Sequence, residues 1–250
     1  MKYILAILIT ICSLNANEYY SKANPIWSYK ISSEVSGKVI YSDDFSEGKF
    51  GTNIPVIKIF DDLDRLDLNS SQEEYKNLQQ MVKIAQKLYN IDLRAYKKIE
   101  NLSTYSKTQK DAKLMKMLGS KTSLLTKKTN LAKLNLKIKT LEDRIEKKNI
   151  KVDKKYYIYK IYPKVGDFIN FGSPLIEIQD HSSARLTIFV TKEDLEGIES
   201  KTIYLDGEKT EYKVDKVIKV ADSINISSYK VEIVIKKPAL FSKLIKIEFR

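Results

Sequence analysis

The sequence predicts an elongated protein of mixed α and β structure, with a long antiparallel helical hairpin inserted into a small β-domain and a β-barrel after it. Two short motifs, residues 47–59 and 165–178, resemble one another although they lie far apart in the chain. Internal repeats of this kind indicate a shared structural unit. The residues between the motifs have helical spacing, and those after the second motif return to short strand-like runs.

The chain begins with a segment typical of a secretory signal, residues 1–16. Lys2 precedes the apolar run Ile4–Ile11, and Ala16 ends a small-residue site suited to cleavage. The run is shorter than the about 20 residues of a membrane-spanning helix, so an uncleaved anchor is the second interpretation. The only cysteine, Cys12, follows a bulky residue, so we expect no lipid anchor. The mature chain would then be exported and free of disulfides.

Residues 17–32 follow as a short N-terminal segment, and residues 33–69 carry the first copy of the repeated motif. Strands are expected at Val35–Ile40 and Val56–Phe60, where β-branched and aromatic residues gather. The two copies match at four pairs of positions: Gly48 with Gly166, Phe50 with Phe168, Pro55 with Pro174 and Ile59 with Ile178. Each copy therefore reads as half of a small β-domain.

Residues 70–150 predict an antiparallel helical hairpin. A capping box at Ser70 or Ser71 starts the first helix, and Ser106 with Gln109 starts the second. Only residues 103–105 separate the helices, so they must be neighbours. Apolar residues repeat by sevens, as in coiled coils. The expected rows are Leu78, Ala85 and Ile99; Met81, Leu88, Ala95 and Leu102; Met117, Leu124, Leu131, Ile138 and Ile145; and Leu134 with Leu141.

After the hairpin, residues 151–181 hold the second half-motif and residues 182–250 a β-barrel. Strands are expected at Tyr156–Tyr162, Leu175–Ile178 and Leu186–Val190. Two more, Tyr212–Ile218 and Val231–Ile235, flank a connection at Asp222–Ser228. The alternation of short strands and turn residues predicts further β-structure after the hairpin. That it forms a barrel is implied by a family resemblance in these residues.

The basic charge of the chain is concentrated on the predicted hairpin. The net charge is +12, and residues 70–150 supply 19 Lys and Arg against 8 Asp and Glu. Residues 107–139 alone carry ten Lys and one acid, Asp111. Charge runs are usually a solvated helix face, but like charges four residues apart destabilise a helix, so an acidic partner surface is an equal alternative here. Nucleic acid is a poor candidate, because an exported protein does not meet it.

The half-motifs flanking a hairpin resemble the split biotinyl-lipoyl domain of HlyD-type membrane fusion proteins, the periplasmic adaptors of Gram-negative efflux and secretion systems. The most specific stretch is Ile158–Asp180, and Leu186–Ile198 resembles the start of the family's β-barrel. The resemblance covers residues 33–249. It implies a non-enzymatic adaptor without a cofactor. It also implies that the family's membrane-proximal domain, built from both termini, is minimal or absent here.

The resemblance also implies a docking site at the hairpin tip for a TolC-like outer-membrane channel. The family carries an Arg, an apolar residue and a Ser there, and this sequence offers Arg94, Ile99 and Ser106, with Arg94 one position early. Leu102 and Tyr105 are further candidates. A structural interpretation competes with this one, since Ile99 fits a core row and Ser106 fits a helix N-cap.

Other chemistry is poorly supported by the residues. His181 is the only histidine, so neither a metal site nor a catalytic triad can be assembled around it. Met115-Lys116-Met117 imitates a biotin-attachment tripeptide, but it falls within a predicted helix, not on a β-turn.

The sequence therefore predicts a periplasmic adaptor between an inner-membrane transporter and an outer-membrane channel, assembled as a homo-oligomer, six copies by the family rule. The alternative is an exported coiled-coil scaffold of the cell envelope without a transport role. A carrier-domain enzyme subunit is a third class, which would need a modified Lys116.

Overall fold

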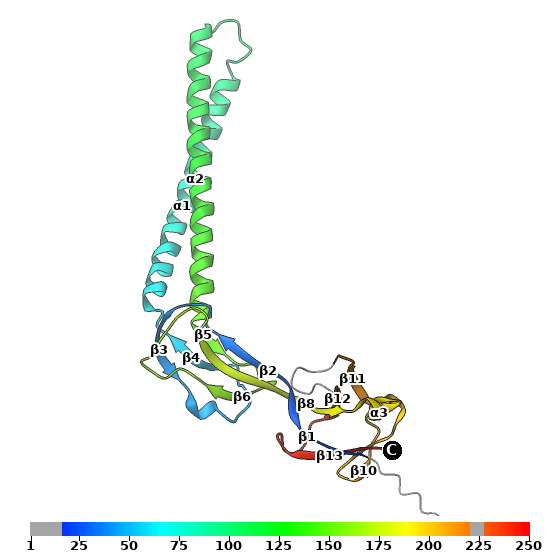
Figure 1. Cartoon of the computed structure of the whole chain (residues 1–250). Coiled ribbons are helices and arrows are strands. Elements are labelled where there is room, and N and C mark those ends of the chain that lie inside the picture. Colours follow the sequence, from blue (N-terminus) through cyan, green and yellow to red (C-terminus); the bar gives the residue numbers. More distant parts are fainter. Residues whose placement is uncertain (1–16, 221–227) are drawn as a thin grey trace, which may run out of the picture.

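The computed structural model describes residues 17–220 and 228–250. The signal-like segment, residues 1–16, and most of the predicted connection at Asp222–Ser228 lie outside the described residues. A long helical hairpin projects from a base made of β-strands (Figure 1). The mixed architecture predicted from the sequence, with one hairpin and several antiparallel sheets, is confirmed.

The two half-motifs build one β-domain at the foot of the hairpin. Its four-stranded sheet has the order β5-β4-β3-β7. The first half supplies the central strands, β3 (Gly37–Ser42) and β4 (Pro55–Ile59). One edge is β5 (Asn149–Lys151), directly after the hairpin, and the other is β7 (Phe168–Ile169) of the second half-motif. The two halves also share one hydrophobic core, in which Val39 and Ile57 pack with Ile158 and Ile176. Neither half buries its apolar face alone, so they fold together.

The repeated glycines hold equivalent turns. Gly48 and Gly166 have φ angles of 77° and 101°, which side chains other than glycine rarely adopt. Near the first of these turns, Gly51 has another reason to be glycine, since a Cβ there would lie 2.3 Å from the carbonyl oxygen of Val152. The first half-motif therefore passes directly against the backbone of the second.

The hairpin consists of α1 (Asp62–Lys97) and α2 (Lys107–Lys147). Here the predicted start of the first helix is wrong, because Ser70 and Ser71 lie inside α1. The N-cap is instead Asp61, nine residues before Ser70, and its side chain accepts a 2.9 Å hydrogen bond from Arg65 Nε. Acidic residues in the first turn suit the positive end of the helix dipole. The capping-box pattern at Ser70 was a coincidence of common polar residues.

Three of the four predicted apolar rows face the partner helix, and one does not. Ala85, Leu124 and Leu134 are buried between the helices, as their rows predict. Met81 and Leu88 are about half exposed, so the second row of α1 is wrong. The inner positions are taken instead by partly buried Val82, Tyr89 and Tyr96. Residues at any of the seven heptad positions recur every seven residues. The repeat therefore does not show which of these rows is buried against the partner helix.

A second core lies in the C-terminal β-region, where the sequence predicts a β-barrel and which we call the barrel region. One sheet has the order β1-β13-β9-β10 and another β11-β12-β8-β2, with β6 also paired to β8. The strands are β1 (Glu18–Lys22), β2 (Asn24–Ser32), β6 (Tyr156–Ile161), β8 (Pro174–Val190), β9 (Ile203–Leu205), β10 (Glu208–Lys209), β11 (Val214–Ile218), β12 (Tyr229–Lys236) and β13 (Leu244–Phe249). Three short helices complete the fold: η1 (Asp44–Ser46), α3 (Lys192–Leu195) and η2 (Ile198–Ser200).

Two long strands connect the β-regions. β8 places Ile176 in the core at the foot of the hairpin and Leu186 in the barrel core. β2 runs antiparallel to it across the junction, from Asn24 beside Arg185 to Ser32 beside Pro174. Residues 17–32, expected only as a short N-terminal segment, therefore form β1 and β2. β1 pairs with the last strand, β13, a long-range contact that no local pattern announces.

Candidate functional site: the distal hairpin and its tip

The tip of the hairpin is longer than the sequence predicts. α1 ends at Lys97 and α2 begins at Lys107, so the connection runs over residues 98–106. Its second half is fixed by the predicted capping box, which is confirmed. Ser106 Oγ accepts a 3.3 Å hydrogen bond from the Gln109 backbone N–H, and the Gln109 side chain accepts one of 2.9 Å from the Ser106 N–H. The start of α2 is therefore a defined structure.

The five predicted tip residues divide into structural and accessible groups. Ile99 is only 7% exposed and belongs to the hairpin core, and Ser106 serves as the N-cap. Leu102 and Tyr105 are 47% and 41% exposed, and Arg94 is also exposed. The tip thus offers apolar and cationic contact groups, but Ile99 is not one of them. Docking of a channel by these residues stays a prediction.

Sequence reasoning missed an apolar surface on the sides of the hairpin. On α1 it consists of Met81, Ile84, Leu88 and Ile91, which are between 47 and 59% exposed. On α2 it consists of Met115, Leu118, Leu125 and, nearer the base, Leu136, which are between 47 and 73% exposed. We call these the α1 stripe and the α2 stripe. The apolar row through Met81 and Leu88 was the sequence signal for the α1 stripe. α1 has two apolar rows, and only one of them is needed to pack against α2.

The two stripes lie at the same height along the hairpin. Lys116 Nζ lies 3.5 Å from Asp92 and Lys137 Nζ lies 2.7 Å from Asp67, which sets the antiparallel register of the helices. In this register Ile91 is level with Met115, and Met81 with Leu125. Each residue of the α1 stripe comes one residue before an inner position of its helix, whereas Leu118 and Leu125 each come one residue after an inner position of α2. The stripes therefore face different sides.

Charge divides the hairpin into two halves. The distal half, residues 80–130, holds twelve Lys and Arg against three Asp and Glu, a net charge of +9. The proximal half, residues 62–79 and 131–148, holds eight of each and is neutral. The excess charge found on the whole hairpin therefore belongs to its far half, together with the tip and most of both stripes.

The proximal half is held by ion pairs at the base. Asp64 lies 3.3 Å from Arg144 and 2.5 Å from Lys148, and its side chain and that of Lys148 are nearly buried. Lys148 Nζ also donates a 2.8 Å hydrogen bond to the Phe60 carbonyl. Burial by itself would raise the pKa of Asp64, but the hydrogen bonds and charges of Lys148 and Arg144 outweigh it and lower this pKa below its usual value.

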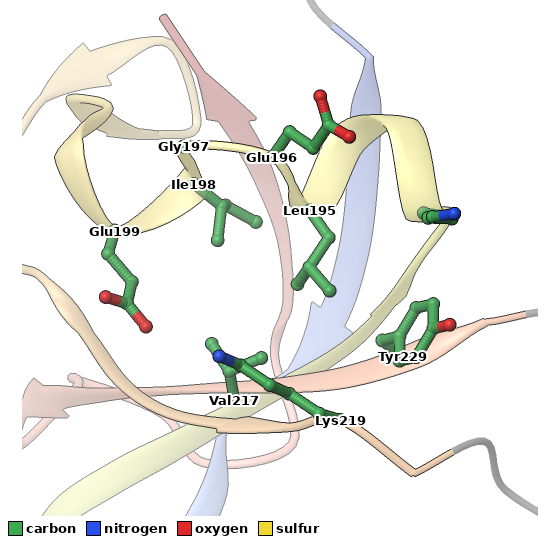
Figure 2. Close-up of a pocket in the computed structure, with 9 residues that line it drawn as sticks. Leu195, Glu196, Gly197, Ile198, Glu199, Val217, Lys219 and Tyr229 are labelled. Atoms are coloured by element: carbon green, nitrogen blue, oxygen red, sulfur yellow. The ribbon is translucent and has the colours of Figure 1, made fainter.

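One of several pockets in the described residues lies in the barrel region. It encloses about 470 Å³. Figure 2 shows Leu195 and Ile198 on one side of it and Val217 and Tyr229 on the other, with Lys219 at the rim. Among the described residues, its lining combines these apolar side chains with two lysines and two glutamates, and contains no Cys, Ser or His. The pocket suits packing of an apolar group better than catalysis.

His181 joins the two β-regions. Its ring stacks on Tyr157 and on Phe241, with centroids 4.3 and 4.0 Å away, and its Nε2 lies 3.0 Å from Gln179 Oε1. Burial and the nearby Lys237 lower the pKa of this histidine, while Asp180 opposes the shift. The stack makes His181 a structural link at the junction.

The structure also places the other residues and segments that the sequence singled out. Residues 17–220 and 228–250 contain no cluster of three or more His, Cys, Asp or Glu that could hold a metal ion. Lys116 of the biotin-like tripeptide lies in α2 and pairs with Asp92, not on a turn. Within the described residues, no helix combines the length and apolarity that crossing a bilayer requires.

Comparison with known proteins gives a clear answer for the fold. No protein-family profile and no curated protein sequence matches the chain. Among solved structures, MacA from Actinobacillus actinomycetemcomitans superimposes with a TM-score of 0.73 at 14% identity, over 94% of this chain and 78% of that one. A MacA–MexA chimera with the Pseudomonas aeruginosa MexA α-hairpin domain gives 0.61 at 14% identity, over 94% and 78%.

The membrane fusion protein Spr0693 from Streptococcus pneumoniae R6 also matches, with a TM-score of 0.53 at 10% identity, over 94% of this chain and 99% of that one. The chain therefore has the membrane fusion protein fold, as its half-motifs predicted. At these identities the similarity establishes the fold and leaves partners and cargo to be argued from this chain's own surfaces.

Proposed function

We propose that this protein is the periplasmic adaptor of a tripartite efflux or secretion system, linking an inner-membrane transporter to a TolC-like outer-membrane channel. The observation that carries the proposal is the shape of the molecule, a β-rich base with one long arm. α2 has 41 residues, which at 1.5 Å per residue is roughly 60 Å. An arm of this length suits a protein that spans a gap between two other components.

The role is geometric and not enzymatic. The base would dock on the transporter, and the tip would present Leu102, Tyr105 and Arg94 to the channel. Contact between coiled coils needs exposed apolar groups with polar neighbours, and these three residues supply both. Energy for transport would come from the transporter. The signal-like residues 1–16 support export to the periplasm.

Several copies would pack side by side, six by the family rule. The neutral proximal half favours this, because its charges are balanced and Leu63 and Leu66 are exposed on it. The domain at the foot of the hairpin adds exposed Phe45, Phe168 and Phe171. Apolar groups in such number on a small domain are typical of protein–protein contact surfaces.

An exported scaffold without a transport role is the second candidate. The exposed apolar surfaces of the hairpin would serve it equally well, since they require a partner but not a transported substrate. The two candidates differ in consequence. Deleting the gene should raise sensitivity to toxic compounds, or block an exported product, for an adaptor and should do neither for a scaffold.

Site-specific photo-crosslinking tests the adaptor role directly. A photoreactive residue at Leu102 or Tyr105 should capture an outer-membrane protein, whereas the same residue at exposed Leu63 should capture another copy of this chain or nothing. Leu102→Asp should abolish the tip adduct and leave the circular dichroism unchanged. Ile99 is unsuitable for this purpose, because its burial means that Ile99→Asp would disturb the tip itself. Absence of an outer-membrane adduct from both tip positions would overturn the adaptor role.

A further inference from the structure

We propose that the distal half of the hairpin docks along its sides onto an acidic α-helical partner, whose apolar row is flanked by carboxylates. The docking surface would then extend from the tip over the α1 and α2 stripes, well beyond Leu102 and Tyr105. The inference rests on the proposed function in one respect: the partner is a component that the far end of the arm reaches.

The spacing of the stripes indicates a helical partner. Met81, Ile84, Leu88 and Ile91 are separated by three, four and three residues, which is the spacing of one seam of a coiled coil. Their other seam, through Val82 and Ala85, is already used within the hairpin. A helix with two apolar seams is built to contact two other helices. The intact hairpin satisfies only one of them.

The α2 stripe repeats this arrangement on the outer side of its helix. Met115, Leu118 and Leu125 keep the same spacing when Thr122 is counted as the fourth member. Thr122 Oγ1 donates a 3.0 Å hydrogen bond to the Leu118 carbonyl, so its hydroxyl is satisfied within the helix and its methyl group remains to pack. Both distal stripes could thus receive a helix at the same height.

The charges beside the stripes specify an acidic partner. Lys83, Lys87 and Arg94 accompany the α1 stripe, and Lys121 and Lys128 accompany the α2 stripe. Of the three acids in the distal half, Asp92 is taken up by Lys116. A partner with carboxylates beside its apolar row would neutralise the excess, and such complementarity also speeds association.

A second copy of this chain fits this surface poorly. Side-by-side packing of two distal halves would bring +9 against +9, and the flanking positions of both stripes are cationic. Like charges placed across an interface oppose association. The proximal half has no such obstacle, since its charges balance. Self-association and partner docking are therefore assigned to different halves of one hairpin.

A plain polyanion or a flat lipid surface also fits poorly. Lysines alone would satisfy a polyanion, and the seven distal stripe residues, all about half exposed or more, would then stay in water. A flat surface could cover one stripe, but the two face different sides of the hairpin. A protein that contributes separate helices to each side accounts for both.

The test uses the purified mature chain and a defined probe. The probe is a designed, fluorescently labelled helical hairpin whose outer face carries leucines at heptad spacing between glutamates, and the matched control probe has glutamine in place of each glutamate. At low salt the glutamate probe should bind at least about tenfold more tightly than the glutamine probe, and this preference should shrink at high salt as charges are screened.

Matched variants locate the surface. Leu118→Ser with Leu125→Ser should weaken probe binding by about tenfold or more, and so should Lys121→Glu with Lys128→Glu. Leu66→Ser with Lys76→Glu, at exposed positions on the proximal part of α1 outside both stripes, should change it by less than about twofold. Circular dichroism of each variant should show that the hairpin is retained, which exposed positions permit.

Several results would overturn the proposal. Equal affinity for the two probes would contradict an acidic partner. Polyglutamate binding as tightly as the glutamate probe would show that the surface is a general polyanion site. A photoreactive residue at Ile84 or Leu118 that captures mainly a second copy of this chain would assign the stripes to self-association. Probe binding that is unaffected by the stripe variants would place the contact elsewhere.

The outcome is separable from that of the adaptor role. If Leu102 and Tyr105 capture an outer-membrane protein but the stripes do not select the acidic probe, the adaptor role stands and this surface fails. If the stripes select the probe but the tip captures no outer-membrane protein, the surface stands and the adaptor role fails.

Discussion

The proximal and distal halves of the hairpin share one inner seam but differ in what they offer to the outside. The proximal half is neutral and is tied to the β-domain by Asp64, Arg144 and Lys148. The distal half has a net charge of +9 and leaves two apolar stripes exposed. The inner seam maintains the arm, while the outer residues specialise its two ends. The apolar residues that hold the helices together and those left exposed therefore lie on different faces of the same helices.

The strongest challenge to this separation is a pair of adjacent substitutions on α2. Leu124 is buried in the inner seam and Leu125 is exposed on the stripe. Leu124→Ala should destabilise the hairpin by about 3 kcal/mol, because it leaves a cavity, whereas Leu125→Ala should cost less than about 0.5 kcal/mol. Urea unfolding followed at 222 nm measures both. Equal losses would mean that the stripe belongs to the core.

The ion pair at the base tests what ties the proximal half to the β-domain. Asp64→Asn should cost about 2 kcal/mol, because it leaves the nearly buried Lys148 without its anionic partner. The matched variant Asp67→Asn removes a carboxylate that is half exposed, and its loss should stay below about 1 kcal/mol. Similar losses for the two variants would show that the burial of Asp64 has no special role.

Acid should reveal the same ion pair. The pKa of Asp64 is lower in the folded protein than in the unfolded chain, so its contribution is fully present above the unfolded pKa, near 3.9. The contribution is lost as the pH falls through that value toward the folded pKa. Unfolding measured between pH 5 and 2 should therefore be less pH-dependent in Asp64→Asn. An unchanged slope would remove Asp64 from the acid response.

The smallest effect is expected at the tip, where the two helices of the distal half meet. Ser106→Ala removes the N-cap of α2 and should cost about 1 kcal/mol, while Ser106→Asp should keep most of the cap. Hydrogen exchange of the first turn of α2 is the appropriate measurement, because fraying there is local. Faster exchange in Ser106→Asp than in Ser106→Ala would contradict the capping role.

Much of the fold could be predicted because its signals are local. The glycines of the repeated motif mark turns with positive φ, the Ser106 and Gln109 pair marks a helix start, and the inner row of α2 follows a clean heptad. Each of these depends on residues close together in sequence. The start of α1 at Asp62 was missed because an acidic, polar first turn resembles a loop as much as a helix.

The candidate site was harder to predict than the fold. Leu102 and Tyr105 are accessible at the tip as expected, but Ile99 is buried in the seam. The stripes could not be predicted as a site, because a seven-residue repeat shows only that apolar residues share one face of a helix. Which face is inside depends on how the partner helix is placed, and this is a long-range property.

The sequence alone determined the β–hairpin–β order, the helical insert, the capping box of α2 and the basic charge of the arm, because propensity, spacing and charge are properties of neighbouring residues. Only the tertiary structure decided that β1 pairs with β13, that β8 enters both cores with β2 paired beside it, and that the Met81 row faces outward. Those outcomes depend on which apolar surfaces, distant in sequence, are buried against each other. The hydrophobic effect is non-directional, so the local sequence does not specify these pairings.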